Sequence, residues 1–124
     1  MKNGKSANTP ASPLFAEISA LIEQARNTVI SQAHHTATML YWKIGNMINT
    51  VVLQEKRAEY GKQIVSALAT QLQEKFGRTY ELRNLRRMMQ FAEQFLNEKI
   101  VGPLARQLRW YHFLLLLPLK RWVL

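Results

Sequence analysis

The residues best suited to chemistry in this chain of 124 residues are arginines gathered in the stretch FGRTYELRNLRRMMQF, from Phe76 to Phe91. Within ten residues it carries four of them: Arg78, Arg83, Arg86 and Arg87. Guanidinium groups form paired hydrogen bonds with phosphates and with the edge of guanine. The stretch therefore suits a surface that binds nucleic acid, although the solvated side of an amphipathic helix would also be charged.

Helical spacing places several polar side chains of this region on one line. In a helix that begins near residue 81, intervals of four, three and four residues separate Arg83, Arg87, Gln90 and Gln94. Arg86 lies beside this line, and Asn84 lies at its edge. Arg, Asn and Gln form paired hydrogen bonds with base edges, and the line contains neither lysine nor acid. A merely solvated face usually mixes charges of both signs, so the pattern favours nucleic acid while the alternative stays open.

The charge of the whole chain points the same way. Seventeen Lys and Arg residues face eight acids, which gives a net charge of +9 and a pI near 10.3. Such a chain is attracted to polyanions, and DNA, RNA and an anionic membrane face are the candidates. Solubility alone needs a net charge of only about 2–8 in a small domain.

No catalytic or metal site is expected. All eight acids are glutamates scattered along the chain, none in a Glu-x-Lys pair, whereas metal-dependent phosphodiester cleavage uses clustered carboxylates. His34 and His35 are adjacent and would point about 100° apart on a helix, so they cannot form a two-ligand face. There is no cysteine, no Gly-rich phosphate loop and no G-x-S-x-G motif. We therefore predict a protein that is not an enzyme and uses no cofactor.

The sequence predicts a cytoplasmic protein without a membrane segment. The absence of cysteine fits a reducing compartment, and the polar first ten residues show no signal peptide. The longest uncharged apolar run near the C-terminus, Trp110–Leu119, has about half the length that a membrane-spanning helix needs.

Apolar periodicity predicts an all-α fold of five to six helices: a flexible arm over residues 1–12, then a single domain over residues 13–124. Ser12 and Pro13 would start a first long helix near 13–31, and a second long helix would cover 36–54. The pattern between them leaves open whether they form a hairpin or one long bent helix.

The second half of the chain predicts a pair of helices resembling a helix-turn-helix. The first helix would cover 60–76 and end at Gly77, and the second would cover 81–97. Gly102-Pro103 would end that second stretch. Two short helices would follow, near 104–110 and in the apolar segment broken by Pro118.

Two other clusters have alternative interpretations. Arginines beside aromatic side chains can stack on bases, and a secondary nucleic-acid site would comprise Arg106, Arg109, Trp110 and His112. Core packing is nevertheless the favoured interpretation of Trp110-Tyr111-His112, and also of Tyr41-Trp42. The run Leu114–Leu117 would form a buried helix or a dimer surface, and we expect a homodimer.

Four segments in order carry a resemblance to a known family: LYWKIGNMI (40–48), RAEYGKQIVSALATQLQEKFG (57–77), NLRRMMQF (84–91) and QLRWYHFLLLLPLK (107–120). The chain resembles the N-terminal domain of the YhcG-type PDDEXK nucleases over about residues 13–120. The resemblance implies a helical module that binds or targets duplex or branched DNA and precedes a separate nuclease domain. It also implies that this nuclease domain, or a nuclease subunit, is a partner, in defence, repair or mobile-element processing.

The chain departs from the family pattern at three places. Glu81 stands where the family tends to have serine, and Tyr111 replaces the serine of a Trp-Ser-His pattern. Family members continue into the nuclease domain, whereas this sequence stops at Leu124; the lack of Asp and of Glu-x-Lys agrees with a missing nuclease domain. We therefore expect a non-enzymatic DNA-binding module. The alternative is an oligomerisation or protein-docking module without direct nucleic-acid contact.

Overall fold

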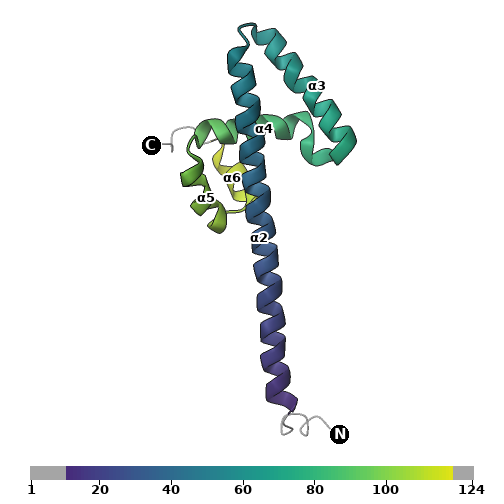
Figure 1. The fold of residues 1–124 in the computed structure, drawn as a ribbon, viewed down its shortest axis with the longest axis vertical. Helices are drawn as coiled ribbons and strands as arrows, with labels where there is room; N and C mark the ends of the chain where they lie inside the picture. The colour runs from purple at the N-terminus through teal and green to yellow at the C-terminus, as the bar shows by residue number, and fades with distance from the viewer. Residues whose placement is uncertain (1–10, 119–124) are drawn as a thin grey trace. The chain divides into compact units, whose positions relative to one another are not determined.

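A computed structural model describes residues 11–118, and all regular structure within them is helical, without strands (Figure 1). The elements in chain order are α2 (Ala11–Gln54), α3 (Ala58–Phe76), the 3-10 turn η1 (Arg78–Tyr80), α4 (Leu82–Gln94), α5 (Glu98–Gln107) and α6 (Trp110–Leu116). The predicted all-α class is therefore confirmed. The predicted arm and the segment after Pro118 fall largely outside the described residues.

The two stretches expected as separate N-terminal helices form one helix, α2, of 44 residues. The weakly patterned segment 31–38 contains neither glycine nor proline, so nothing in it interrupts the backbone hydrogen bonds. The possibility of a hairpin is thereby removed. The prediction that Ser12 caps this helix is wrong, because α2 already includes Ala11 and Ser12 therefore lies inside the helix.

The chain falls into two compact units, residues 1–33 (unit 1) and residues 34–124 (unit 2). The described part of unit 1 is the first half of α2, and from residue 20 to residue 33 every side chain is exposed. Unit 2 contains the rest of α2 and all later helices, and it holds the hydrophobic core.

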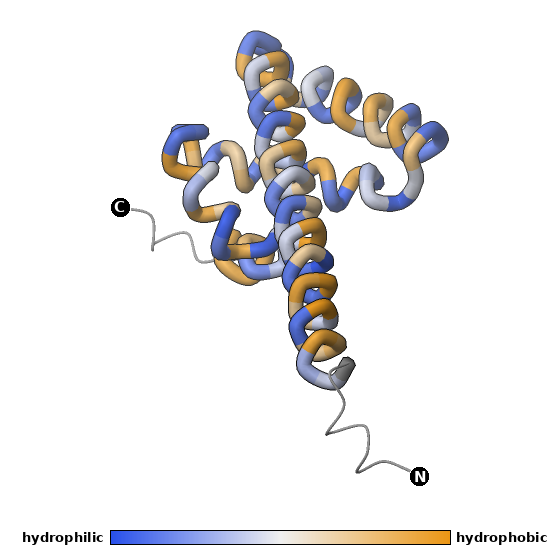
Figure 2. Tube along the Cα trace, turned by 60° about the horizontal axis from the view of Figure 1, so that its bottom comes forward, coloured by the Kyte–Doolittle hydropathy of each residue, from blue (hydrophilic) through white to orange (hydrophobic). Residues whose placement is uncertain are grey.

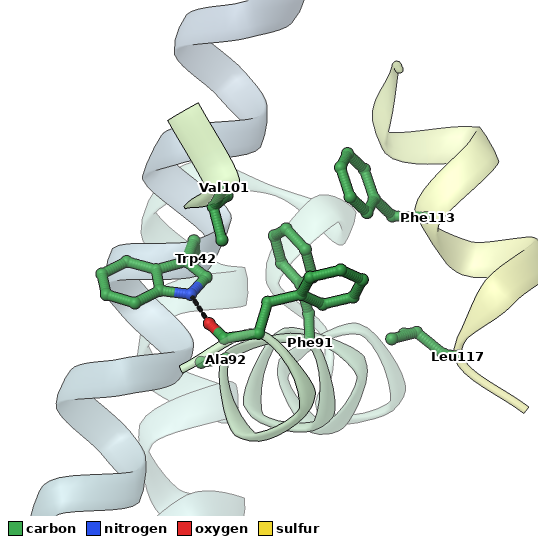
Figure 3. Packing of buried hydrophobic residues seen from close by; sticks show 7 residues of the cluster. Trp42, Phe91, Ala92, Val101, Phe113 and Leu117 are labelled. Carbon is green, nitrogen blue, oxygen red and sulfur yellow. Dashed lines mark hydrogen bonds between the residues drawn. The ribbon is translucent and has the colours of Figure 1, made fainter. Parts of the chain in front are cut away.

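Two clusters of buried side chains make up this core. The first is rich in aromatic residues and comprises Trp42, Phe91, Ala92, Phe95, Val101, Phe113 and Leu117 (Figure 3). The second is aliphatic and comprises Ile48, Val65, Ala69, Leu85 and Met88. Helix α4 contributes to both clusters, and the ring of Trp110 packs against both, so α4 is the central helix of unit 2.

Three residues of α2 contact the backbone of α4 and of its C-cap residue. The indole Nε1 of Trp42 donates a hydrogen bond to the Phe95 carbonyl at 2.6 Å, and Asn49 Nδ2 donates to the Met89 carbonyl at 2.9 Å. Between them, Gly45 lies so close to α4 that an added Cβ would meet the Met88 carbonyl group. The spacing of three and four residues puts Trp42, Gly45 and Asn49 on one face of α2. This face sets the position of α4.

The turn between α3 and α4 follows the prediction closely. Gly77 ends α3 with φ 104°, a left-handed value that favours glycine, and its N–H donates to the Gln73 carbonyl at 2.9 Å. The turn η1 follows, and α4 begins at Leu82 with Glu81 as its N-cap residue. The Glu81 side chain makes no capping hydrogen bond, so the positive end of α4 carries an acid nearby but no side-chain cap.

The predicted boundaries after α4 are partly wrong. Helix α4 ends at Gln94 and not near residue 97, and the carbonyl of its C-cap residue, Phe95, accepts the hydrogen bond from Trp42. Asn97 then starts α5, and its side chain accepts from the Lys99 N–H at 2.9 Å. Gly102-Pro103, expected to end the preceding stretch, lies inside α5, where burial of the neighbouring apolar side chains outweighs the local propensity.

Candidate nucleic-acid interface

Helix α4 has a buried side and a basic side. Leu85, Met88, Phe91 and Ala92 are buried. Arg83 and Arg86 are exposed and Arg87 is partly exposed. Leu85, Met88 and Ala92 thus form the inner side of α4, and Arg83 lies on the outer side, as expected for the polar line. Because the inner side is held by the core and by α2, the basic side cannot turn inward without unfolding the helix.

The arginines of this side have no carboxylate partner in the described part of the chain. The one ion pair found between residues 11 and 118 joins Arg57 Nε to Glu55 Oε1 at 3.0 Å. Arg78, Arg83, Arg86 and Arg87 therefore keep their charges unneutralised within that range. Two of them, Arg78 and Arg83, stand at the turn and first helical turn next to Glu81, the nearest acid in sequence.

A shallow hollow of about 640 Å³ lies over this basic side. Its lining comes from α3, the turn and α4, and comprises Gln73, Glu81, Leu82, Arg83, Arg86, Arg87 and Gln90. Three guanidinium groups thus converge on one surface with a single carboxylate. We call Arg78, Arg83, Arg86 and Arg87 the arginine face.

Gln90 and Gln94, the second half of the predicted polar line, form hydrogen bonds within the domain. The side-chain amides of Gln90 and Gln94 both donate to the Leu117 carbonyl, at 3.1 and 2.9 Å. The Oε1 atom of Gln94 is buried and accepts no hydrogen bond from any described residue. These glutamines hold the segment after α6 against α4. Asn84, at the edge of the line, is partly buried.

The four residues of the predicted secondary nucleic-acid site lie in different surroundings. The ring of Trp110 lies 5.0 Å from that of Tyr41 and 5.1 Å from that of Phe91, so Trp110 packs against the core, in agreement with the favoured interpretation. The Nδ1 atom of His112 accepts from the Arg109 N–H at 3.1 Å at the start of α6. The arginines of this cluster, Arg106 and Arg109, are exposed.

Sequence reasoning missed the residues that position the arginine face. Gly45 and Asn49 contact the backbone of α4. Their role depends on which helix packs against them, and helical periodicity does not reveal this.

Tyr41, expected in the core, is half-buried there. Burial raises the pKa of its phenol, and the neighbouring Tyr80 raises it further.

The described residues make an all-α domain whose central helix presents an unpaired basic face. No helix among them is long and apolar enough to cross a membrane, and residues 11–118 contain no group of three or more His, Cys, Asp or Glu that could hold a metal ion. Residues 17–122 match the DUF1016 N-terminal domain, and the chain belongs to that family. The match confirms the expected placement as an N-terminal domain. No curated protein and no solved structure matches the chain.

Proposed function

We propose that this domain binds DNA through the arginine face and serves as the targeting module of a PDDEXK-type nuclease, without a catalytic site of its own. The observation that carries the proposal is that, among residues 11–118, no carboxylate pairs with the four neighbouring arginines on the outer side of α4 and the turn before it. Arginine that is already paired gains little from a phosphate, whereas unpaired arginine releases counterions when it binds one.

The hydrogen bonds of the glutamines narrow the binding mode. Gln90 and Gln94 are suited by type to reading bases, but their amides already bond to the Leu117 carbonyl. The arginines and Asn84 remain, and phosphate contacts position a protein on DNA without carrying sequence information. The proposed binding is therefore mainly electrostatic and depends weakly on base sequence. Its affinity can still differ between duplex and branched DNA, because these differ in the arrangement of their phosphates.

The test is a fluorescence-anisotropy titration of the whole chain against duplex, branched and single-stranded DNA at two salt concentrations. We expect affinity to fall steeply with salt. Arg83→Ala with Arg87→Ala should weaken binding by about 1–3 kcal/mol for each of the two arginines that bonds to a base, or flatten the salt slope by about 1 for each that bonds to a phosphate. Arg83→Lys with Arg87→Lys separates charge from the forked geometry of arginine, because it keeps the former and removes the latter.

The matched control removes the same charge elsewhere. Lys43 and Lys99 are exposed and lie outside the arginine face, so Lys43→Ala with Lys99→Ala should change affinity much less than the arginine pair. Equal losses in both double variants would mean that net charge alone drives binding. Full affinity in the arginine variant for every DNA form would refute the proposal.

The second candidate function is protein docking, with the arginines merely solvated. It is supported by an apolar hollow of about 300 Å³ between α3 and the unit 2 part of α2, lined by Ile44, Met47, Ile48, Val51, Ile64, Leu68 and Leu72. A nuclease domain or subunit that offers an apolar helix is the partner this candidate implies. Binding of that kind should hardly respond to salt, and this separates it from DNA binding.

A further inference from the structure

Unit 1 exposes an unusual amount of apolar surface. Seven large apolar side chains between residues 14 and 30 are about half to three-quarters exposed: Leu14, Phe15, Ile18, Leu21, Ile22, Val29 and Ile30. Phe15 reaches 73 % and Val29 68 %. A helix usually owes most of its stability to packing of its apolar face. In this half of α2 those side chains are exposed, and Figure 2 shows hydrophobic stretches, in orange, recurring along it.

These side chains follow the spacing of a helix that pairs with another helix. Phe15, Ile18, Ile22, Ala25 and Val29 are separated by three, four, three and four residues, which is the alternation of a coiled-coil seam. Leu14 and Leu21 flank this seam on one side. We call the seven exposed apolar residues the unit 1 stripe. Ala20 and Asn27 lie on the opposite side of the helix and provide a reference face.

Charge limits what can cover the unit 1 stripe. Residues 11–33 contain one arginine and two glutamates, a net of −1, which leaves sixteen of the seventeen basic residues and six of the eight acids to the rest of the chain. An amphipathic helix that binds an anionic membrane carries Lys and Arg on its polar face. This segment carries a single arginine against two glutamates, so an apolar protein surface is the better occupant.

The exposed area is of the size that a dimer needs. Complete burial of an aliphatic or aromatic side chain removes about 60–120 Å² of apolar surface, so the exposed fractions of the stripe amount to roughly 400 Å² per copy. A standard interface buries about 800 Å² per partner, of which a little over half is apolar. The seam of a second copy therefore matches the unit 1 stripe in both area and length.

We propose that two copies of this chain pair antiparallel along the unit 1 stripe. Each copy continues after residue 33 into a unit that carries most of the positive charge. Antiparallel pairing puts the two copies of residue 33, where each chain enters its basic unit, at opposite ends of helices about 35 Å long, which is far beyond the screening length of about 8–10 Å. It also opposes the helix dipoles. This pairing is independent of the proposed DNA binding.

The first test is sedimentation velocity of the whole chain at high salt, where repulsion between basic units is screened. We expect a concentration-dependent dimer, and Ile18→Glu with Ile22→Glu should raise its dissociation constant at least about 100-fold, because it places unpaired carboxylates in the seam. Ala20→Glu with Asn27→Glu adds the same charge on the reference face and should leave the dimer intact. All four positions are exposed, so near-UV circular dichroism should show the fold of unit 2 unchanged.

The second test uses the absence of cysteine from the chain. A disulfide requires Cα atoms within about 7 Å, so in an antiparallel pair Ile22→Cys near the centre should crosslink two copies, while Phe15→Cys and Val29→Cys should not. Crosslinking by all three variants would overturn the antiparallel arrangement. A chain that stays monomeric at high micromolar concentration, or a dimer that resists the Ile18 and Ile22 substitutions but not Leu115→Glu, would overturn the proposal itself.

Discussion

A single methyl group added at Gly45 should weaken the packing of α2 against α4. The Cβ of Gly45→Ala would overlap the carbonyl group of Met88 and stand 2.9 Å from the Met89 nitrogen. These are backbone atoms of a helix, so they cannot rotate away as a side chain would. Relief requires that α4 move off α2 as a body.

The expected cost follows from what such a movement strains. Overpacking of a tight interface costs about 1–3 kcal/mol. The hydrogen bonds from Trp42 to Phe95 and from Asn49 to Met89 lie on either side of Gly45, and weakening them would cost up to about 1 kcal/mol each. Alanine gains about 1 kcal/mol over glycine within a helix. We therefore expect Gly45→Ala to lower the free energy of unfolding by up to about 4 kcal/mol.

Urea unfolding followed by circular dichroism measures this change, and α5 provides the control. Gly102 is also helical, but an added Cβ there meets no atom within 4 Å, so Gly102→Ala should be neutral or stabilising by up to about 1 kcal/mol. If Gly45→Ala matches Gly102→Ala in its effect, α2 and α4 do not approach as closely as described, and the account of how α4 is positioned fails.

The remaining predictions probe the core around α4. Trp42→Phe should lower the unfolding free energy by about 1–3 kcal/mol in urea melts, because the indole hydrogen bond to Phe95 is removed. Leu85→Ala should cost about 2–5 kcal/mol and change DNA affinity only through unfolding. Burial, and secondarily the neighbouring Tyr80, raises the pKa of Tyr41 above its value in the unfolded chain. The free energy of unfolding should therefore fall as the pH rises above about 10. Tyr41→Phe should remove this part of the pH dependence in urea melts at alkaline pH.

The sequence predicts the parts of the fold that local rules decide. The pair α3 and α4 follows from apolar spacing and from Gly77, whose left-handed φ no other residue adopts as readily. The inner line of α4, with Leu85 and Met88, follows from the same spacing. The continuity of α2 does not follow from it, because a polar segment without helix breakers has no pattern that marks it as helix or turn.

Interactions between distant segments lie beyond local rules. Gly102-Pro103 is a strong helix-breaking signal in a sequence. Helix α5 nevertheless continues through it, and Val101 and Ala105 on either side are buried. Gln90 and Gln94 resemble a reading surface when only their own helix is considered, whereas their partner is the carbonyl of Leu117, more than twenty residues away. Helical periodicity identifies a polar face but not what that face touches.

These interactions together decide from which direction a polyanion would reach α4. The inner side is held by Trp42, Gly45 and Asn49, and the C-terminal half of the outer side is covered where Gln90 and Gln94 bond to Leu117. Within residues 11–118, the part that stays open to a large ligand is the N-terminal half of the outer side, with the turn after Gly77. The arginine face lies in this half, next to the positive end of the helix dipole. If DNA binds, its backbone would therefore approach along the turn and the first two turns of α4.

Among residues 11–118, Glu81 is the one acid that lines the hollow over the arginine face, and its negative charge would repel a DNA backbone that approaches in this way. Glu81→Ser should therefore strengthen DNA binding in the same titration. Weaker binding by that variant would contradict this direction of approach.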